Sequence, residues 1–112
     1  MKKIELQLTT RQLNSLVYLL NFLERIHPKT RDEKVMKAIL LEISVKIEKK
    51  HVDVKSSLNT LFSKPKKPKF TWKYYEADAL EKFLIVIQNE AMNEYDHTVV
   101  NFLKSKLNQQ LA

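Results

Sequence analysis

The sequence predicts an α+β protein in which a β-α-α unit occurs twice. Residues 4–9 and 70–75 alternate apolar and polar side chains, which is the period of a strand with one buried face. After each of these segments come two stretches in which apolar residues recur at spacings of three and four, the pattern of amphipathic helices. We therefore expect two short antiparallel strands packed on four helices.

The two halves also agree in spacing. Apolar positions of the first helix recur 67 residues later, those of the second helix recur 64 residues later, and the strands match at an offset of 66. Chance similarity between amphipathic helices is the alternative, but the shared order and length of the elements favour an internal duplication. The pattern predicts a single domain over residues 1–112, with repeat one at 3–50, a linker at 51–69 and repeat two at 70–112.

Capping residues predict where the helices begin. Thr9–Gln12 and Thr30–Glu33 both have the form of a capping box, in which two side chains satisfy backbone amides reciprocally. Asp53 is expected to begin a short extra helix over residues 53–62 in the linker, and Asp96 to cap the fourth helix. Three acidic residues suit the positive end of the third helix as surface charge: Glu76, Asp78 and Glu81.

The second helix of repeat one carries an apolar stripe that repeat two lacks. Its residues are Ala38, Leu41 and Val45, whereas the matching positions 102, 105 and 109 are mostly polar. Either the segment 51–63 or a second copy of the chain is expected to cover this stripe. The open edges of a two-stranded sheet pose the same choice, because a helix must cover them or a second copy must extend the sheet to four strands.

The aromatic run in the second strand has a core side and an outer side. If Phe70 faces the core, the alternation places Trp72 and Tyr74 there as well and leaves Tyr75 outside. A buried Trp72 is favoured over a platform for stacking bases, because an indole buries a large apolar area. The candidate interface residues are Ala38, Leu41, Val45 and Tyr75.

Positive charge is concentrated in the first half and the linker. The net charge is +7, while residues 70–112 hold four basic and six acidic side chains. Seven lysines are candidates for contact with nucleic acid or another anion: Lys49, Lys50, Lys55, Lys64, Lys66, Lys67 and Lys69. Because only three of the 20 basic residues are arginine and no helix-turn-helix pattern is present, a solvated lysine surface is the favoured interpretation and nucleic-acid binding the alternative.

Missing residue types exclude several classes of protein. The chain has no glycine, so it contains no phosphate-binding loop, dinucleotide fingerprint or nucleophile elbow, and it has no cysteine for a disulfide, a thiolate nucleophile or a zinc ligand. His27, His51 and His97 are not spaced as metal ligands, and no serine or carboxylate pair has the context of a catalytic group. We expect no metal, no cofactor and no catalytic residue.

No stretch approaches the ~20 apolar residues of a membrane span, and the first eight residues lack the apolar core of a signal peptide. The sequence therefore predicts a small, non-enzymatic, cytoplasmic protein that forms a homodimer or binds a partner protein. The alternative is an accessory nucleic-acid-binding protein that uses its lysine-rich linker against phosphates.

Overall fold

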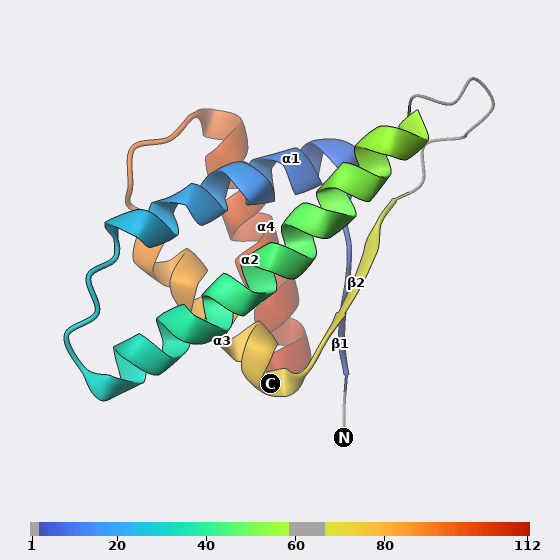
Figure 1. Ribbon diagram of the computed structural model, residues 1–112. Coiled ribbons are helices and arrows are strands. Elements are labelled where there is room, and N and C mark those ends of the chain that lie inside the picture. The colour runs from blue at the N-terminus through green and yellow to red at the C-terminus, as the bar shows by residue number, and fades with distance from the viewer. Residues whose placement is uncertain (1–2, 59–66) are drawn as a thin grey trace.

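The computed structural model describes residues 3–58 and 67–112 (Figure 1). It contains two strands, β1 (Ile4–Gln7) and β2 (Lys69–Trp72), four α-helices and a short 3₁₀ helix, η1 (Leu20–Arg25), that continues the first α-helix. The α-helices are α1 (Thr10–Leu19), α2 (Arg31–Leu58), α3 (Tyr74–Ile87) and α4 (Glu94–Leu111). The α+β class, the antiparallel strand pair and the four helices are confirmed.

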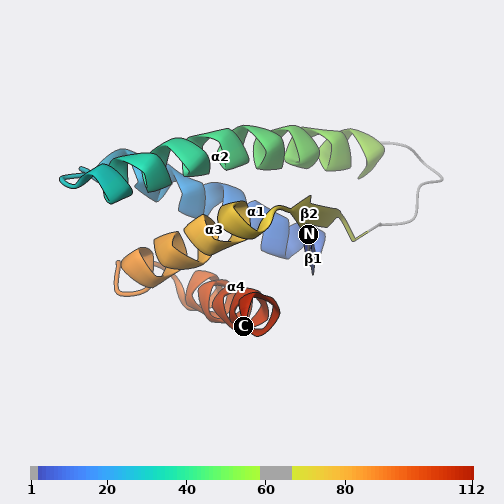
Figure 2. The same cartoon turned by 90° about the horizontal axis from the view of Figure 1, so that it is seen from below.

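The helices form layers beside the sheet. Seen from below, α2 lies on one outer side, α1 and α3 lie in the middle, and α4 lies on the opposite side (Figure 2). The sheet stands at one end of these layers, where both views show β1 and β2 side by side (Figure 1). One face of α2 therefore packs on the protein while the other points to solvent.

The sheet contributes its inner face to the core. Ile4 pairs with Trp72 and Leu6 pairs with Phe70, and all four side chains are buried, whereas the residues between them are exposed. The remaining core comes from all the α-helices and η1, and its fully buried members include Leu13, Leu16, Leu40, Ile43, Leu80, Phe83, Leu103 and Leu107. A two-stranded sheet is marginal in water, so this shared core is what holds the strands together.

A helix covers the open edge of β1. The side chain of Gln110, in the last turns of α4, accepts a hydrogen bond from the Glu5 N–H at 2.9 Å and donates one to the Glu5 carbonyl at 2.6 Å. These are the backbone groups that an edge strand would otherwise present to another strand. The sequence left two alternatives for this edge, a covering helix or a strand of a second copy, and the structure shows the covering helix.

Both predicted capping boxes are present. Thr9 Oγ1 accepts from the Gln12 N–H while Gln12 Oε1 accepts from the Thr9 N–H, and Thr30 and Glu33 make the same reciprocal pair at the start of α2. The prediction for α4 was wrong. Asn93 caps that helix by accepting from the Asp96 N–H at 2.8 Å, and Asp96 lies inside the first turn because the helix begins earlier than expected.

The separate helix expected over residues 53–62 does not form over its described part. Residues 53–58 continue α2, which is one helix of 28 residues, and residues 59–62 lie outside the described part of the chain. No proline or glycine interrupts this stretch, and Val54 packs against the core, so nothing ends the helix at Asp53. Because residues 51–58 extend along the helix axis, they do not fold back over the stripe of Ala38, Leu41 and Val45.

Tyr74 does not face the core as the alternation predicted. It is 49% exposed, and its hydroxyl donates to the Leu111 carbonyl at 3.0 Å. The reason is that the strand ends at Trp72 and α3 begins at Tyr74, so the period of two no longer applies. Trp72 is buried and Tyr75 is exposed, as expected.

Replacement of Gln110 by alanine is expected to lower the free energy of unfolding by about 1 kcal/mol, because two hydrogen bonds to an edge strand are lost. Urea unfolding measures the loss, and amide hydrogen exchange should be faster at Glu5. Gln109→Ala is the matched control, since Gln109 is an exposed neighbour on the same helix. Equal effects of the two substitutions would show that the contact to β1 contributes nothing.

Candidate functional site

The outer face of α2 exposes an apolar row, which we call the α2 stripe: Ala38, Leu41, Val45 and Val52. Leu41, Val45 and Val52 are 49%, 65% and 59% exposed. They lie on the side of the helix opposite Leu40, Ile43 and Ile47, which are fully buried in the core. The sequence had identified three of the four residues; Val52 joins them because α2 does not end near residue 50.

The spacing of the α2 stripe is that of a coiled-coil seam. Ala38, Val45 and Val52 are seven residues apart, and Leu41 lies three residues after the first of them, so these residues occupy the a and d positions of a heptad. The d positions that follow Leu41 are Glu48 and Lys55. The seam is therefore apolar over its first half and mixed over its second half.

Tyr75 belongs to a different surface. It lines a groove of about 400 Å³ between the start of α2 and the start of α3, together with Val35, Met36, Ile39 and Ala79. The rim of this groove is mostly acidic and consists of Asp32, Glu33, Asp78 and Lys82. The structure thus separates Tyr75 from the other three predicted interface residues.

Lys82, the cation on the rim of the groove among the described residues, is already engaged. Its ammonium lies 2.9 Å from the Asp78 carboxylate, one helical turn away, and this carboxylate raises the pKa of Lys82. At the start of α2, the N–H groups of Lys29 and Thr30 bind the Glu33 carboxylate and lower its pKa. The Glu33 carboxylate therefore stays ionised near neutral pH.

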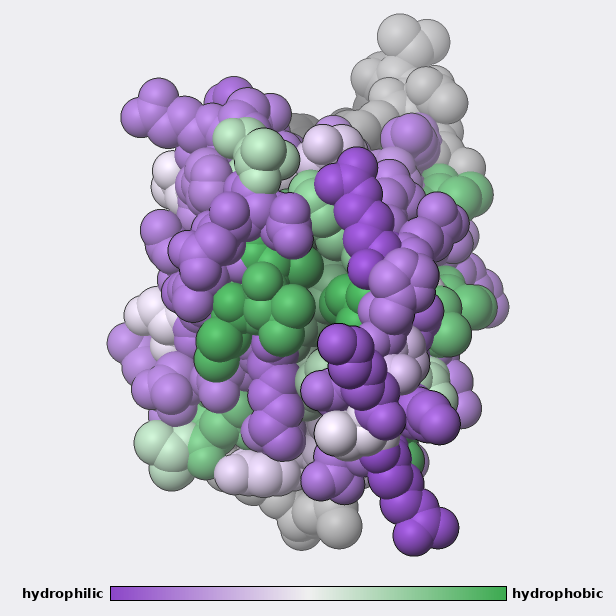
Figure 3. Space-filling view, turned by 90° about the vertical axis from the view of Figure 1, so that its left-hand side faces the viewer, coloured by the Kyte–Doolittle hydropathy of each residue, from purple (hydrophilic) through white to green (hydrophobic). Residues whose placement is uncertain are grey.

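A second group of exposed apolar residues lies at the end of α3. Ile85 and Val86 are exposed in its last turn. Figure 3 shows the side of the molecule on which α3 ends, where a cluster of hydrophobic side chains is surrounded by hydrophilic ones. Small groups of exposed apolar residues are common on soluble proteins and by themselves indicate no site.

The basic side chains gather at the other end of α2 and on the sheet. Residues 46–73 hold nine lysines and two carboxylates, so this stretch carries a net charge equal to the +7 of the whole chain. Among the seven predicted contact lysines, five are exposed: Lys49, Lys50, Lys55, Lys67 and Lys69. Lys64 and Lys66 lie outside the described residues. The end of α2 and the start of β2 lie on the same side of the molecule (Figures 1 and 2).

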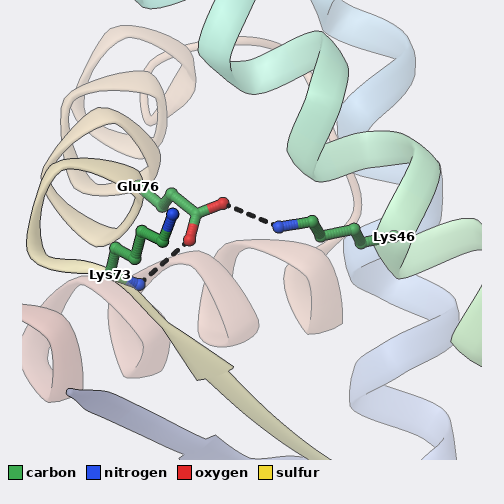
Figure 4. A network of polar contacts seen from close by, with 3 residues as sticks. All are labelled: Lys46, Lys73 and Glu76. Atoms are coloured by element: carbon green, nitrogen blue, oxygen red, sulfur yellow. Dashed lines mark hydrogen bonds and ion pairs between the residues drawn. The ribbon is translucent and has the colours of Figure 1, made fainter.

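Glu76 is buried, although the sequence indicated a surface charge. Its carboxylate accepts from the Lys73 N–H at 2.9 Å and from the Lys46 ammonium at 3.1 Å, so it links the start of α3 to α2 (Figure 4). Burial by itself raises the pKa of Glu76, but the two hydrogen bonds and the positive charge of Lys46 outweigh it, and the pKa lies below its ordinary value of 4.5. This contact is a structural ion pair at the junction of strand and helix.

A second buried polar contact joins α1 to α4. The Ser15 hydroxyl donates to the Asp96 carboxylate, and both residues are buried. Next to them, the Arg11 guanidinium lies 3.9 Å from the centre of the Tyr95 ring. These groups are satisfied by one another, so they explain their own burial without a ligand.

The described residues place no three His, Cys, Asp or Glu side chains together in a way that suits a metal ion. No helix in the same part of the chain is both long enough and apolar enough to cross a bilayer.

Comparison with protein-family models, with curated proteins and with solved structures finds no match to this chain. Among the exposed surfaces of the described residues, the α2 stripe and the lysine-rich surface are the two most suited to binding a macromolecule.

Sequence reasoning missed the polar contacts that join distant elements. Gln110 and the pair Ser15 and Asp96 have no local signal, because their partners lie 105 and 81 residues away along the chain. A weak signal existed for Glu76 alone. It follows Lys73 by three residues at the end of a strand pattern, which is the spacing at which a side chain reaches back to a helix N-terminus.

Glu76→Gln is expected to lower the free energy of unfolding at neutral pH by about 1–3 kcal/mol, because Lys46 loses its charged partner. Since the folded-state pKa is lowered, Glu76 stabilises the protein above pH 4.5 and this contribution is lost as the pH falls through the folded-state value. Urea unfolding between about pH 3 and 7 should therefore show a shallower acid dependence in the variant.

Glu90→Gln is the control, since Glu90 is exposed in the loop before α4. It should leave both the stability and its pH dependence unchanged. An acid dependence of Glu76→Gln identical to that of the native chain would contradict the assigned ion pair.

Proposed function

We propose that this protein is a non-enzymatic cytoplasmic module that associates with itself through the α2 stripe. The observation that supports the proposal is the set of three large aliphatic side chains, Leu41, Val45 and Val52, about half exposed or more on the solvent side of one helix. Their heptad spacing suits another helix rather than a small ligand. A second copy of the chain supplies such a helix without any further assumption.

Charge favours an antiparallel arrangement of the two helices. In a parallel pair, Glu48 would face Glu48 and Lys55 would face Lys55 in the seam. In an antiparallel pair, Leu41 meets Val52 of the second copy and Glu48 meets Val45 of the second copy. Glu42 and Lys49 flank the seam, and Glu42 of each copy then lies opposite Lys49 of the other copy.

The expected association is weak. Each copy offers only four apolar side chains, well short of the roughly 800 Å² per partner that stable interfaces bury. We expect a dissociation constant on the order of 10 to 100 μM. The fraction of dimer would then depend on the concentration of the protein. A partner protein with a similar helix would compete with the second copy for the α2 stripe.

We also infer that the two β-α-α halves arose by duplication, which would make the fold a two-fold arrangement within one chain. The strand register supports this inference. Glu5 lies opposite Thr71, and these residues are equivalent at the offset of 66 by which the strands match. In a symmetric dimer with paired antiparallel strands, equivalent residues of the two copies lie opposite each other at the two-fold axis. The same relation within one chain is expected if the two halves arose from such a dimer.

Sedimentation velocity between about 5 and 500 μM tests self-association. The native chain should shift toward twice the monomer mass, whereas Leu41→Glu and Val45→Glu should stay monomeric with unchanged thermal stability. Ile85→Glu is the matched control, because Ile85 is comparably exposed on α3. A native chain that remains a monomer at the highest concentration would disprove the proposal.

The orientation has its own test. Glu42→Lys and Lys49→Glu should each weaken the dimer severalfold, because like charges then face each other across the seam. The double variant should regain the native affinity if the helices are antiparallel. Failure of the double variant to recover would reject the antiparallel pairing, even if the native chain is a dimer.

A further inference from the structure

The solvent face of the β1–β2 pair is polar and lysine-rich, and we call it the ribbon face. It consists of the exposed side chains that alternate with the buried ones along both strands: Lys3, Glu5, Gln7, Lys67, Lys69, Thr71 and Lys73. Four of these seven residues are lysines. In Figures 1 and 2, α1, α3 and α4 lie on the other side of the strands, while the end of α2 extends past β2.

The carboxylate on the ribbon face is paired with a lysine. The Glu5 carboxylate lies 3.1 Å from the Lys69 ammonium, and both side chains are more than half exposed. Lys49, Lys50 and Lys55 add further positive charge at the end of α2, on the side where β2 begins. The β2 half of the ribbon face therefore belongs to residues 46–73, the stretch whose net charge equals that of the whole chain.

The backbone of the two strands is fixed by the core and by α4. Phe70 and Trp72 are buried in the core, with ring centroids 5.6 Å apart, and Gln110 holds Glu5 through both of its backbone polar groups. The Leu8 N–H donates to the Pro68 carbonyl at 3.0 Å and extends the pairing beyond β2. The exposed side chains are thus presented from a rigid support.

We infer that the ribbon face binds duplex DNA, with the two strands lying in the major groove. The major groove admits a two-stranded β-ribbon, and side chains that point outward from it reach the base edges. Gln7 and Thr71 are the groups on this face suited to hydrogen bonds with bases. Lys67, Lys69 and Lys73 are placed to contact phosphates.

The observations favour duplex DNA over other nucleic acids. Single strands are bound by stacking on exposed aromatic side chains, but both aromatic residues of the strands, Phe70 and Trp72, are buried. The exposed Tyr74 and Tyr75 lie on α3, where the Tyr74 hydroxyl is bonded to the Leu111 carbonyl and Tyr75 lines the groove beside α2. The major groove of an RNA duplex is too deep and narrow for side chains to read. Pairing with a strand of a second copy is disfavoured because lysines on an edge strand repel such pairing.

Fluorescence anisotropy tests this inference with a labelled DNA duplex of about 20 base pairs and mixed sequence, the unpaired strand, and an RNA duplex of the same sequence. The DNA duplex should bind most tightly, and the logarithm of its affinity should fall with the logarithm of salt at a slope of about −4 to −6. No binding at low salt, or tighter binding of the single strand or of RNA, would overturn the inference.

Two double variants with equal loss of charge locate the site. Lys67→Gln with Lys69→Gln should weaken binding about tenfold at ~50 mM salt and make the salt slope shallower by about 2. Lys29→Gln with Lys34→Gln, near the start of α2, should change affinity by less than about twofold. Similar losses from the two pairs would show that the attraction is non-specific and does not involve the ribbon face.

A gain of affinity provides an independent check. Glu5→Gln removes the carboxylate and should tighten DNA binding about two- to fivefold, whereas unchanged or weaker binding would contradict contact at the ribbon face. The Leu41→Glu variant, which tests self-association, should bind the duplex with the affinity of the native chain when both are measured at concentrations at which they are monomers. Failure of DNA binding and failure of self-association can therefore be told apart.

Discussion

The pairing of β1 with β2 is the interaction on which the rest of the structure depends. It joins the start of the chain to its middle, and it sets Ile4 against Trp72 and Leu6 against Phe70 on one buried face. Two strands of four residues are too little sheet to be stable in water, so they persist only because the helices cover their apolar side. In return, the paired strands orient the helices that follow them, since α1 begins three residues after β1 and α3 begins two residues after β2.

Polar contacts between distant elements then fix how the layers meet. Gln110 attaches α4 to the edge of β1, Glu76 connects the start of α3 to Lys46 of α2, and Ser15 joins α1 to Asp96 of α4. Buried polar groups are costly unless satisfied, so each contact favours one relative placement of two elements over its alternatives. Apolar packing alone would tolerate more than one arrangement of these helices.

The fold presents two surfaces of different chemistry. The α2 stripe is aliphatic and suits another helix, whereas the ribbon face is cationic, hydrogen-bonding and supported by the core. The two surfaces share no residue, so the proposed association of two chains and the proposed binding of DNA would not compete for the same groups. A second copy docked on α2 would also bring two ribbon faces into one assembly, which raises affinity for an extended polyanion through multivalency.

The sequence by itself determined the order of the two strands and four α-helices, the buried face of each strand and the capping boxes at Thr9 and Thr30, because each depends on residues within a few positions of one another. The same local logic identified Ala38, Leu41 and Val45 as an apolar stripe that repeat two lacks, although it expected the segment 51–63 or a second copy to cover it. It failed where the outcome depended on residues far apart in the chain. The packing of Val54 kept α2 continuous past Asp53, and Ser15 drew Asp96 into the interior while Asn93 capped α4. Only the tertiary structure brings together residues separated by 30 to 105 positions, and those contacts decided which polar side chains are buried and which edge of the sheet is covered.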